Sequence, residues 1–197
     1  MFPPIVRKTF GLNRRFFLIF EPLLASAQLV TACVTAYFIL SVAAHAQIVA
    51  LGASDVAGWF GVLHHQTWPA QLEEMLKAKG YNVQVKNAGK PGDTPWGLLR
   101  RLDSAVPSGT KIVILAKEGL YTNNKLSTAK ADEAMNTVET KVKSRGITII
   151  PANAGVVLQN AGLRADDVHL NAAGHKELAT RLLPLVIRAL GSPSQSG

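Results

Sequence analysis

Three residues have the side chains needed to activate a hydroxyl for acyl transfer, and they come from distant parts of the chain. Ser54 follows the apolar run IVALG at 48–52, while Asp166 and His169 stand three residues apart before the last apolar segment. A serine hydroxyl is a weak nucleophile until an imidazole takes its proton, and a carboxylate must fix the tautomer of that imidazole. The three residues therefore predict a Ser–His–Asp triad if the fold brings them together.

The residues around Ser54 have the pattern of a strand, a sharp turn and the start of a helix. Residues 48–52 favour a strand, and Asp55 follows Ser54 at the predicted helix start. In an open α/β sheet such a bend lies at the carboxyl end of a strand, where ligands bind. A tight turn with Ser54 as a helix cap accounts for the same pattern without any catalytic role. We expect Asp55 to point to solvent, because the helix dipole favours a carboxylate there.

Three short segments resemble those of a known enzyme family. The Gly-Ala-Ser turn at 52–54 and the Asp-Asp-Val-His segment at 166–169 resemble the first and last blocks of the SGNH or GDSL esterases and lipases. The segment NAGKPGDT at 87–94 resembles the second block, whose glycine gives a backbone N–H to the oxyanion hole. The resemblance covers residues 47–190.

The resemblance implies a role for each matched residue. Ser54 would be the nucleophile, His169 the general base and then acid, and Asp166 the carboxylate that orients the imidazole. Asp167 is the alternative orienting acid, although the family spacing favours Asp166. The N–H groups of Ser54 and Gly92 would hold the oxyanion. No metal or organic cofactor is implied.

The third block departs from the family pattern. The family has Gly-x-Asn-Asp there, with the asparagine as an oxyanion donor; if Gly119 matches the family glycine, Leu120 falls close to that asparagine. Removing one such donor typically costs about 2.7–4 kcal/mol of transition-state stabilisation. Asn123 or Asn124 could supply the missing amide, and Tyr121 could offer a hydroxyl instead. The alternative function is therefore a degenerate SGNH-fold binding protein that recognises an ester or glycan with little or no turnover.

Strand and helix patterns alternate along the rest of the chain. Strands are predicted at 48–52, 81–86, 111–115 and 147–150, with helices near 68–79, from 95, at 127–144 and after Asn171. This order predicts a three-layer α/β/α sandwich, flavodoxin-like, with a mostly parallel sheet of four to five strands. No Gly-x-Gly-x-x-Gly or P-loop pattern follows a strand, which argues against a nucleotide or flavin binder.

Residues 1–46 have the pattern of an export signal. Basic residues precede an uncharged stretch from Leu23 to Ala44, and Ala44-His45-Ala46 has the form of a cleavage site. We therefore expect a signal peptide at 1–46, an SGNH-hydrolase-like domain at 47–190 and a flexible tail at 191–197. An uncleaved membrane anchor is the alternative, since the stretch is long enough to span a bilayer. Either way, the domain is predicted to be periplasmic or secreted.

Charge and cysteine content narrow the expected partners. The chain has 21 basic and 13 acidic residues, and those after residue 46 alternate with apolar residues as solvated faces do, which argues against nucleic-acid binding. The one cysteine, Cys33, lies in the leader, so the domain has no thiol nucleophile. His64 and His65 lack a third ligand at zinc spacing. The expected partner is a small-molecule, lipid or glycan ester, with membrane contact only through an uncleaved N-terminal segment.

Overall fold

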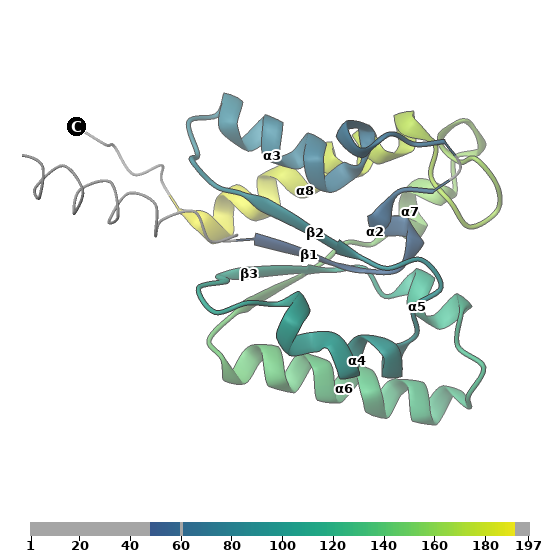
Figure 1. The fold of residues 1–197 in the computed structure, drawn as a ribbon. Coiled ribbons are helices and arrows are strands. Elements are labelled where there is room, and N and C mark those ends of the chain that lie inside the picture. The colour runs from purple at the N-terminus through teal and green to yellow at the C-terminus, as the bar shows by residue number, and fades with distance from the viewer. Residues whose placement is uncertain (1–47, 60, 192–197) are drawn as a thin grey trace, which may run out of the picture. The chain divides into compact units, whose positions relative to one another are not determined.

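The computed structural model describes residues 48–59 and 61–191, which form a sheet between two helical layers (Figure 1). All four strands are parallel and lie in the order β2-β1-β3-β4. Their bounds are β1 (Ile48–Gly52), β2 (Val85–Gly89), β3 (Ile112–Leu115) and β4 (Thr148–Pro151). The predicted three-layer α/β/α sandwich is therefore confirmed. The expected signal peptide and the last six residues, 192–197, lie outside the described residues.

The helices pack in pairs on the two faces of the sheet (Figure 1). One face carries α3 (Trp68–Ala78) and α8 (Ala172–Leu190), and the other carries α4 (Pro95–Ala105) and α6 (Thr128–Ser144). Short helices follow the strand ends: α2 (Ser54–Ala57), α5 (Glu118–Thr122) and α7 (Ala154–Leu158). The single turns η1 (His64–Gln66) and η2 (Ala161–Leu163) complete the elements.

Strand β1 is the centre of the core. All five of its residues are buried, because parallel strands inside a doubly covered sheet have no solvent face. Side chains alternate between the faces of a strand. Ile48 and Ala50 therefore pack with the residues of α3 and α8, while Val49 and Leu51 pack with those of α4 and α6. The end of β1, where Ser54 follows, is thus fixed from both sides.

One predicted strand is displaced. The alternating segment 81–86 predicted a strand there, whereas β2 runs from Val85 to Gly89. Within the described residues, the pairing of β1 with β2 begins at Ile48 and Val85. Tyr81 and Val83 are buried all the same, which explains their alternating pattern. The prediction that β1 and β2 are neighbours is confirmed.

His175 joins α8 to the start of α3. Its Nδ1 accepts a hydrogen bond from the N–H of Trp68 at 3.2 Å, and its side chain is almost fully buried. Burial lowers the pKa of His175 to about 4. The neutral ring therefore has a structural role, because it links α8 to the start of α3. A structural role is what its position in the first turns of the last helix predicted.

The titration of His175 predicts acid destabilisation. In the unfolded chain the imidazole takes up a proton near pH 6.5, whereas in the folded protein it does so only near pH 4. Stability from this residue is therefore present above pH 6.5 and falls as the pH drops toward 4, by about 2 kcal/mol between pH 7 and pH 5. His175→Asn keeps an acceptor without the titration, so urea unfolding should show a smaller loss over that interval. Equal losses of unfolding free energy in wild type and His175→Asn would contradict this prediction. The control is His65→Asn, because His65 is exposed.

Gly89 lets β2 pass beneath α2. A Cβ at this position would lie 2.2 Å from the backbone nitrogen of Ala57. The Asn87 side chain fixes the same junction, since its amide donates to the Val56 carbonyl at 2.8 Å and its oxygen accepts from the N–H of Gly89 at 3.0 Å. The close approach of β2 therefore determines where α2, and Ser54 at its start, can lie.

Gly89→Ala should destabilise the protein by about 1–3 kcal/mol, because two packed backbones must separate. Gly155→Ala is the matched control, since a Cβ there would meet its nearest atom at 3.8 Å within a helix. Guanidinium unfolding of both variants measures the difference. If the two variants were equally stable, the contact between β2 and α2 would not fix this junction.

Candidate active site

The side chains of Ser54, His169 and Asp166 form a continuous hydrogen-bonded chain. Ser54 Oγ lies 3.1 Å from His169 Nε2, although the two residues are 115 positions apart in sequence. His169 Nδ1 lies 2.8 Å and 3.0 Å from the two carboxylate oxygens of Asp166. A carboxylate only accepts, so Nδ1 carries the ring proton and Nε2 accepts from the serine hydroxyl. This is the arrangement in which an imidazole can remove a proton from serine.

The position of Ser54 follows from the contacts of α2. Ser54 is the first residue of this helix, directly after the end of β1. The indole N–H of Trp68, at the start of α3, donates to the Asp55 carbonyl at 3.1 Å. With the Asn87 bond to Val56, α2 is held from both neighbouring elements, so the hydroxyl is presented from a fixed turn.

His169 is held by the loop that leads into α8. The N–H of Ala165 donates to the His169 carbonyl at 2.8 Å, and the Asn171 side chain caps α8 by accepting from the N–H of Gly174 at 2.9 Å. The ring of Trp59 lies beside the imidazole, with ring centroids 6.4 Å apart and planes inclined at 28°. The helix cap was predicted from sequence, whereas the contribution of Trp59 was not.

Of the two neighbouring acids, Asp166 contacts the imidazole. Its Oδ1 also accepts the N–H groups of Val168 at 2.8 Å and His169 at 2.7 Å. These bonds, led by the one from Val168, lower the pKa of Asp166 and keep it ionised. The side chain of Asp167 is 95% exposed and lies 3.6 Å from Arg164. Asp166 therefore has the geometry of the orienting acid, and Asp167 does not.

A small cavity of about 120 Å³ lies beside Ser54. Residues of β1's turn, α5, α7 and the His169 loop line it: Ser54, Asp55, Glu118, Gly119, Thr122, Asn123, Ala154, Leu158, Asp167, Val168 and His169. Of the predicted oxyanion residues, Ser54 and Asn123 line this cavity, while Gly92 and Asn124 do not. The walls combine apolar residues with acidic ones.

The loop that carries Gly92 is fixed against the end of β1. The N–H of Lys90 donates to the Gly52 carbonyl at 3.2 Å, and Arg101 donates to the same carbonyl at 3.1 Å. Arg101 also forms an ion pair with buried Asp93 at 2.7 Å. Gly92 adopts φ +72°, a conformation that favours glycine. Its role as an oxyanion donor stays a prediction.

The third block is rearranged. Leu120, expected near the family asparagine, is fully buried in the core, and Glu118 lines the cavity instead. The amide of Asn123 donates to the carbonyls of Asp93 at 3.2 Å and Gly119 at 2.9 Å. Asn124 turns away and donates to the carbonyl of residue 126 at 2.8 Å. Sequence reasoning missed Glu118, whose only signal was its place just after a buried strand.

Asp55 does not point to solvent, contrary to the expectation from its place at a helix start. It is 5% exposed; its Oδ1 accepts the N–H of Ala53 at 3.1 Å, and its buried Oδ2 has no hydrogen-bond partner. Burial, with a contribution from Glu118, raises the pKa of Asp55 to about 6. The physical reason is α5: Gly119 has no side chain, so this helix packs directly over the carboxylate.

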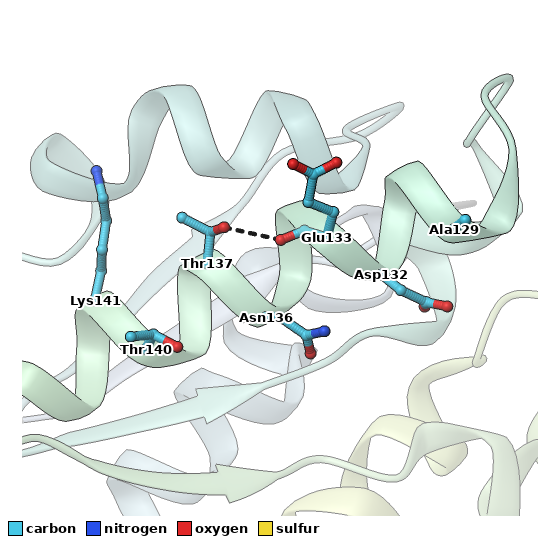
Figure 2. Close-up of a pocket in the computed structure, with 7 residues that line it drawn as sticks. All are labelled: Ala129, Asp132, Glu133, Asn136, Thr137, Thr140 and Lys141. Atoms are coloured by element: carbon cyan, nitrogen blue, oxygen red, sulfur yellow. Dashed lines mark hydrogen bonds between the residues drawn. The ribbon is translucent and has the colours of Figure 1, made fainter.

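Two other hollows lack a comparable arrangement. Figure 2 shows the larger one, about 520 Å³, where the side chains all project from the single helix α6 and Thr137 donates to the Glu133 carbonyl at 2.9 Å. A third, about 270 Å³, includes His64 and His65. Within residues 48–59 and 61–191, no three His, Cys, Asp or Glu residues are grouped so that they could hold a metal ion. The same residues include no helix with the length and apolar character of a membrane span.

Comparisons with known proteins support the fold. No protein-family model and no curated protein matches the sequence. TesA is 21% identical, with 72% of this chain and 98% of that one covered and a TM-score of 0.62. A lipase/acylhydrolase from Enterococcus faecalis is 21% identical, with 77% and 100% covered and a TM-score of 0.61. The psychrotrophic esterase EstA from Pseudoalteromonas sp., inhibited by monoethylphosphonate, is 15% identical, with 74% and 98% covered and a TM-score of 0.62.

Further matches in fold include the SGNH-hydrolase family esterase AlinE4 and lipolytic proteins of the G-D-S-L family. The chain therefore has the α/β/α fold of the SGNH esterases and lipases, which agrees with the resemblance of its short motifs. Fold alone does not determine activity. The functional conclusion depends on the residues of the site.

The buried Asp55 predicts a loss of stability as the pH rises from about 4 to about 6. Its pKa is about 6 in the folded protein against 3.8 as the ordinary value, so its contribution is present below pH 3.8 and is lost as the pH rises through 6. Asp55→Asn should therefore gain about 2 kcal/mol on wild type between pH 4.5 and pH 8, measured by urea unfolding. Exposed Asp167→Asn is the control and should show little change. If the difference in unfolding free energy between Asp55→Asn and wild type were the same at both pH values, Asp55 would not ionise in its buried position as we expect.

Proposed function

We propose that this chain is a divergent SGNH-type serine hydrolase that cleaves carboxylic esters through an acyl-enzyme. The observation that carries the proposal is the hydrogen-bonded chain from Ser54 Oγ through His169 to Asp166. The fold shared with known esterases and the cavity beside the hydroxyl add support. The substrate class is a small-molecule, lipid or glycan ester.

In the proposed mechanism, Ser54 Oγ attacks the acyl carbonyl while His169 Nε2 takes its proton. Asp166 stabilises the imidazolium, and the N–H groups of Ser54 and Gly92 hold the oxyanion. His169 then gives the proton to the departing alcohol, which leaves the acyl group on Ser54. A water molecule, deprotonated by His169, attacks this ester; the acid is released and the serine is restored.

The N-terminal segment extends the proposal to location. Residues 1–46 combine a basic start, an uncharged apolar stretch and an A-x-A site, so we propose that the hydrolase works in the periplasm or outside the cell. Cleavage after residue 46 would release the domain 47–190. Retention of the segment would leave the domain anchored to the outer face of the membrane.

The second candidate is a binding protein of the same fold with little turnover. The rearranged third block favours it, because Leu120 is buried and the Asn123 amide is already bonded to two carbonyls. With one donor missing, catalysis would be slower by about a hundred- to thousandfold. Substrate binding would not need that donor to the same degree.

A fluorophosphonate probe separates the two candidates. Purified mature protein should be labelled at Ser54, and it should hydrolyse p-nitrophenyl acetate. Ser54→Ala should abolish labelling, and Ser54→Ala, His169→Ala and Asp166→Asn should each lower kcat/KM by at least about a thousandfold. Exposed Ser144→Ala is the matched control and should behave as wild type.

Three other outcomes would contradict parts of the proposed mechanism. Absence of label together with equal rates in wild type and Ser54→Ala would exclude the hydrolase and favour the binding protein. Labelling of a different serine, identified by peptide mass spectrometry, would contradict the assignment of the nucleophile. A full rate in Asp166→Asn would remove the orienting acid from the mechanism.

A further inference from the structure

The charged walls of the cavity beside Ser54 are acidic. Apart from His169, the ionisable residues that line it are Asp55, Glu118 and Asp167, with no lysine or arginine among the lining residues. Asp167 lies near Arg164, at 3.6 Å. The other two have no cationic partner within the described part of the chain. Among the described residues, the Glu118 side chain accepts one hydrogen bond, from the N–H of Gly155 at 3.5 Å.

Carboxylates outside this cavity do have cationic partners. Nearby carboxylates that are at least half buried do have partners: Asp93 pairs with Arg101 at 2.7 Å, and Glu139 pairs with Lys117. Asp55 is more buried than Glu139, and its Oδ2 has neither a hydrogen bond nor contact with solvent. A buried carboxylate without a partner costs stability, so a group that removes this cost is expected to bind well. The missing partner is a cation.

The geometry also limits the size of that cation. The cavity holds about 120 Å³, well below the roughly 300–1,000 Å³ of typical small-molecule sites. Trp59 stands beside His169, with ring centroids 6.4 Å apart, and the residue is 46% exposed. Aromatic faces attract ammonium groups, most strongly when water is excluded. A small ammonium group therefore suits both the charge and the volume.

The same charges bear on catalysis. Carboxylates close to Ser54 oppose the negative charge that develops on the acyl oxygen in the transition state. A positive charge on the substrate would offset this repulsion while the acyl group is being transferred. The cation would thereby help to replace the stabilisation that the rearranged third block does not supply.

We propose that the preferred substrates are small esters that carry a positive charge close to the scissile carbonyl, with Glu118 in contact with the cation and Asp55 behind it. This inference rests on the proposed hydrolase function. Glu118 is then a specificity-determining residue, and Trp59 places an aromatic ring beside His169, which lines the cavity. The charge can lie on the alcohol, as in choline esters, or on the acyl group, as in aminoacyl esters.

Isosteric ester pairs compare a cationic with a neutral substrate of the same shape, and the change of their rate ratio between wild type and Glu118→Gln cancels the intrinsic reactivity of each ester. Acetylcholine and 3,3-dimethylbutyl acetate differ by the charge on the alcohol, and glycine ethyl ester and ethyl propionate differ by the charge on the acyl group. In at least one pair, wild-type kcat/KM should favour the cationic ester by about tenfold, and added salt should reduce the preference. In Glu118→Gln the preference should fall to about twofold or less, because one full charge is removed. A merely structural role of Glu118 would lower both rates and leave their ratio unchanged.

Glu133→Gln is the matched control, since Glu133 lies on the outer face of α6 (Figure 2). It should keep the wild-type ratio. If Ser54 is labelled by the fluorophosphonate but neither pair shows a preference for the cation, the specificity inference is wrong while the hydrolase stands. If the preference for the cationic ester persists in Glu118→Gln, Glu118 does not recognise the positive charge of the substrate.

A binding measurement keeps the inference testable without turnover. Tetramethylammonium should bind to Ser54→Ala protein in calorimetry, and at least about fivefold more weakly to the double variant with Glu118→Gln. Equal binding to the two proteins, or none to either, would overturn the proposal. A protein that binds this cation but is not labelled at Ser54 would retain the cation site and lose the hydrolase function.

Discussion

The site depends on one hydrogen bond, between Ser54 Oγ and His169 Nε2, that joins the first strand to the loop before the last helix. Neither partner is held by the bond itself. Ser54 is fixed because β1 lies in the middle of the sheet and α2 contacts both β2 and α3. His169 is fixed because Asp166 accepts from its backbone and from its ring. The hydrogen bond therefore joins two segments that are each held in place by other contacts.

Negative charge is the second constraint on this site. Asp55 and Glu118 occupy positions from which an esterase would gain more by a neutral amide, because the transition state is itself an anion. Burial raises the pKa of Asp55 to about 6, so the carboxylate is largely ionised at neutral pH despite its environment. Unpaired carboxylates beside Ser54 carry an electrostatic cost, and we propose that a cationic substrate offsets it. In this proposal, the acidic residues compensate for the rearranged third block by favouring a positively charged ester.

The sequence allowed prediction of the layers, the neighbouring positions of β1 and β2, the Asn171 cap of α8 and the three residues that form the hydrogen-bonded chain. These features depend on local patterns and on short motifs. The environments of Asp55 and Glu118 could not be predicted, because they depend on α5 packing over the end of β1, a contact between distant segments. The choice between Asp166 and Asp167 depends on the directions of their side chains: that of Asp166 contacts His169, whereas that of Asp167 is exposed.

A crystal structure of the protein after reaction with a fluorophosphonate would test whether Ser54 and His169 act together. We predict a covalent bond from phosphorus to Ser54 Oγ, with His169 Nε2 within hydrogen-bond distance of the adduct. The phosphoryl oxygen should lie about 2.7–3.1 Å from the N–H groups of Ser54 and Gly92. An adduct on another residue, or a phosphoryl oxygen directed away from both N–H groups, would contradict the account.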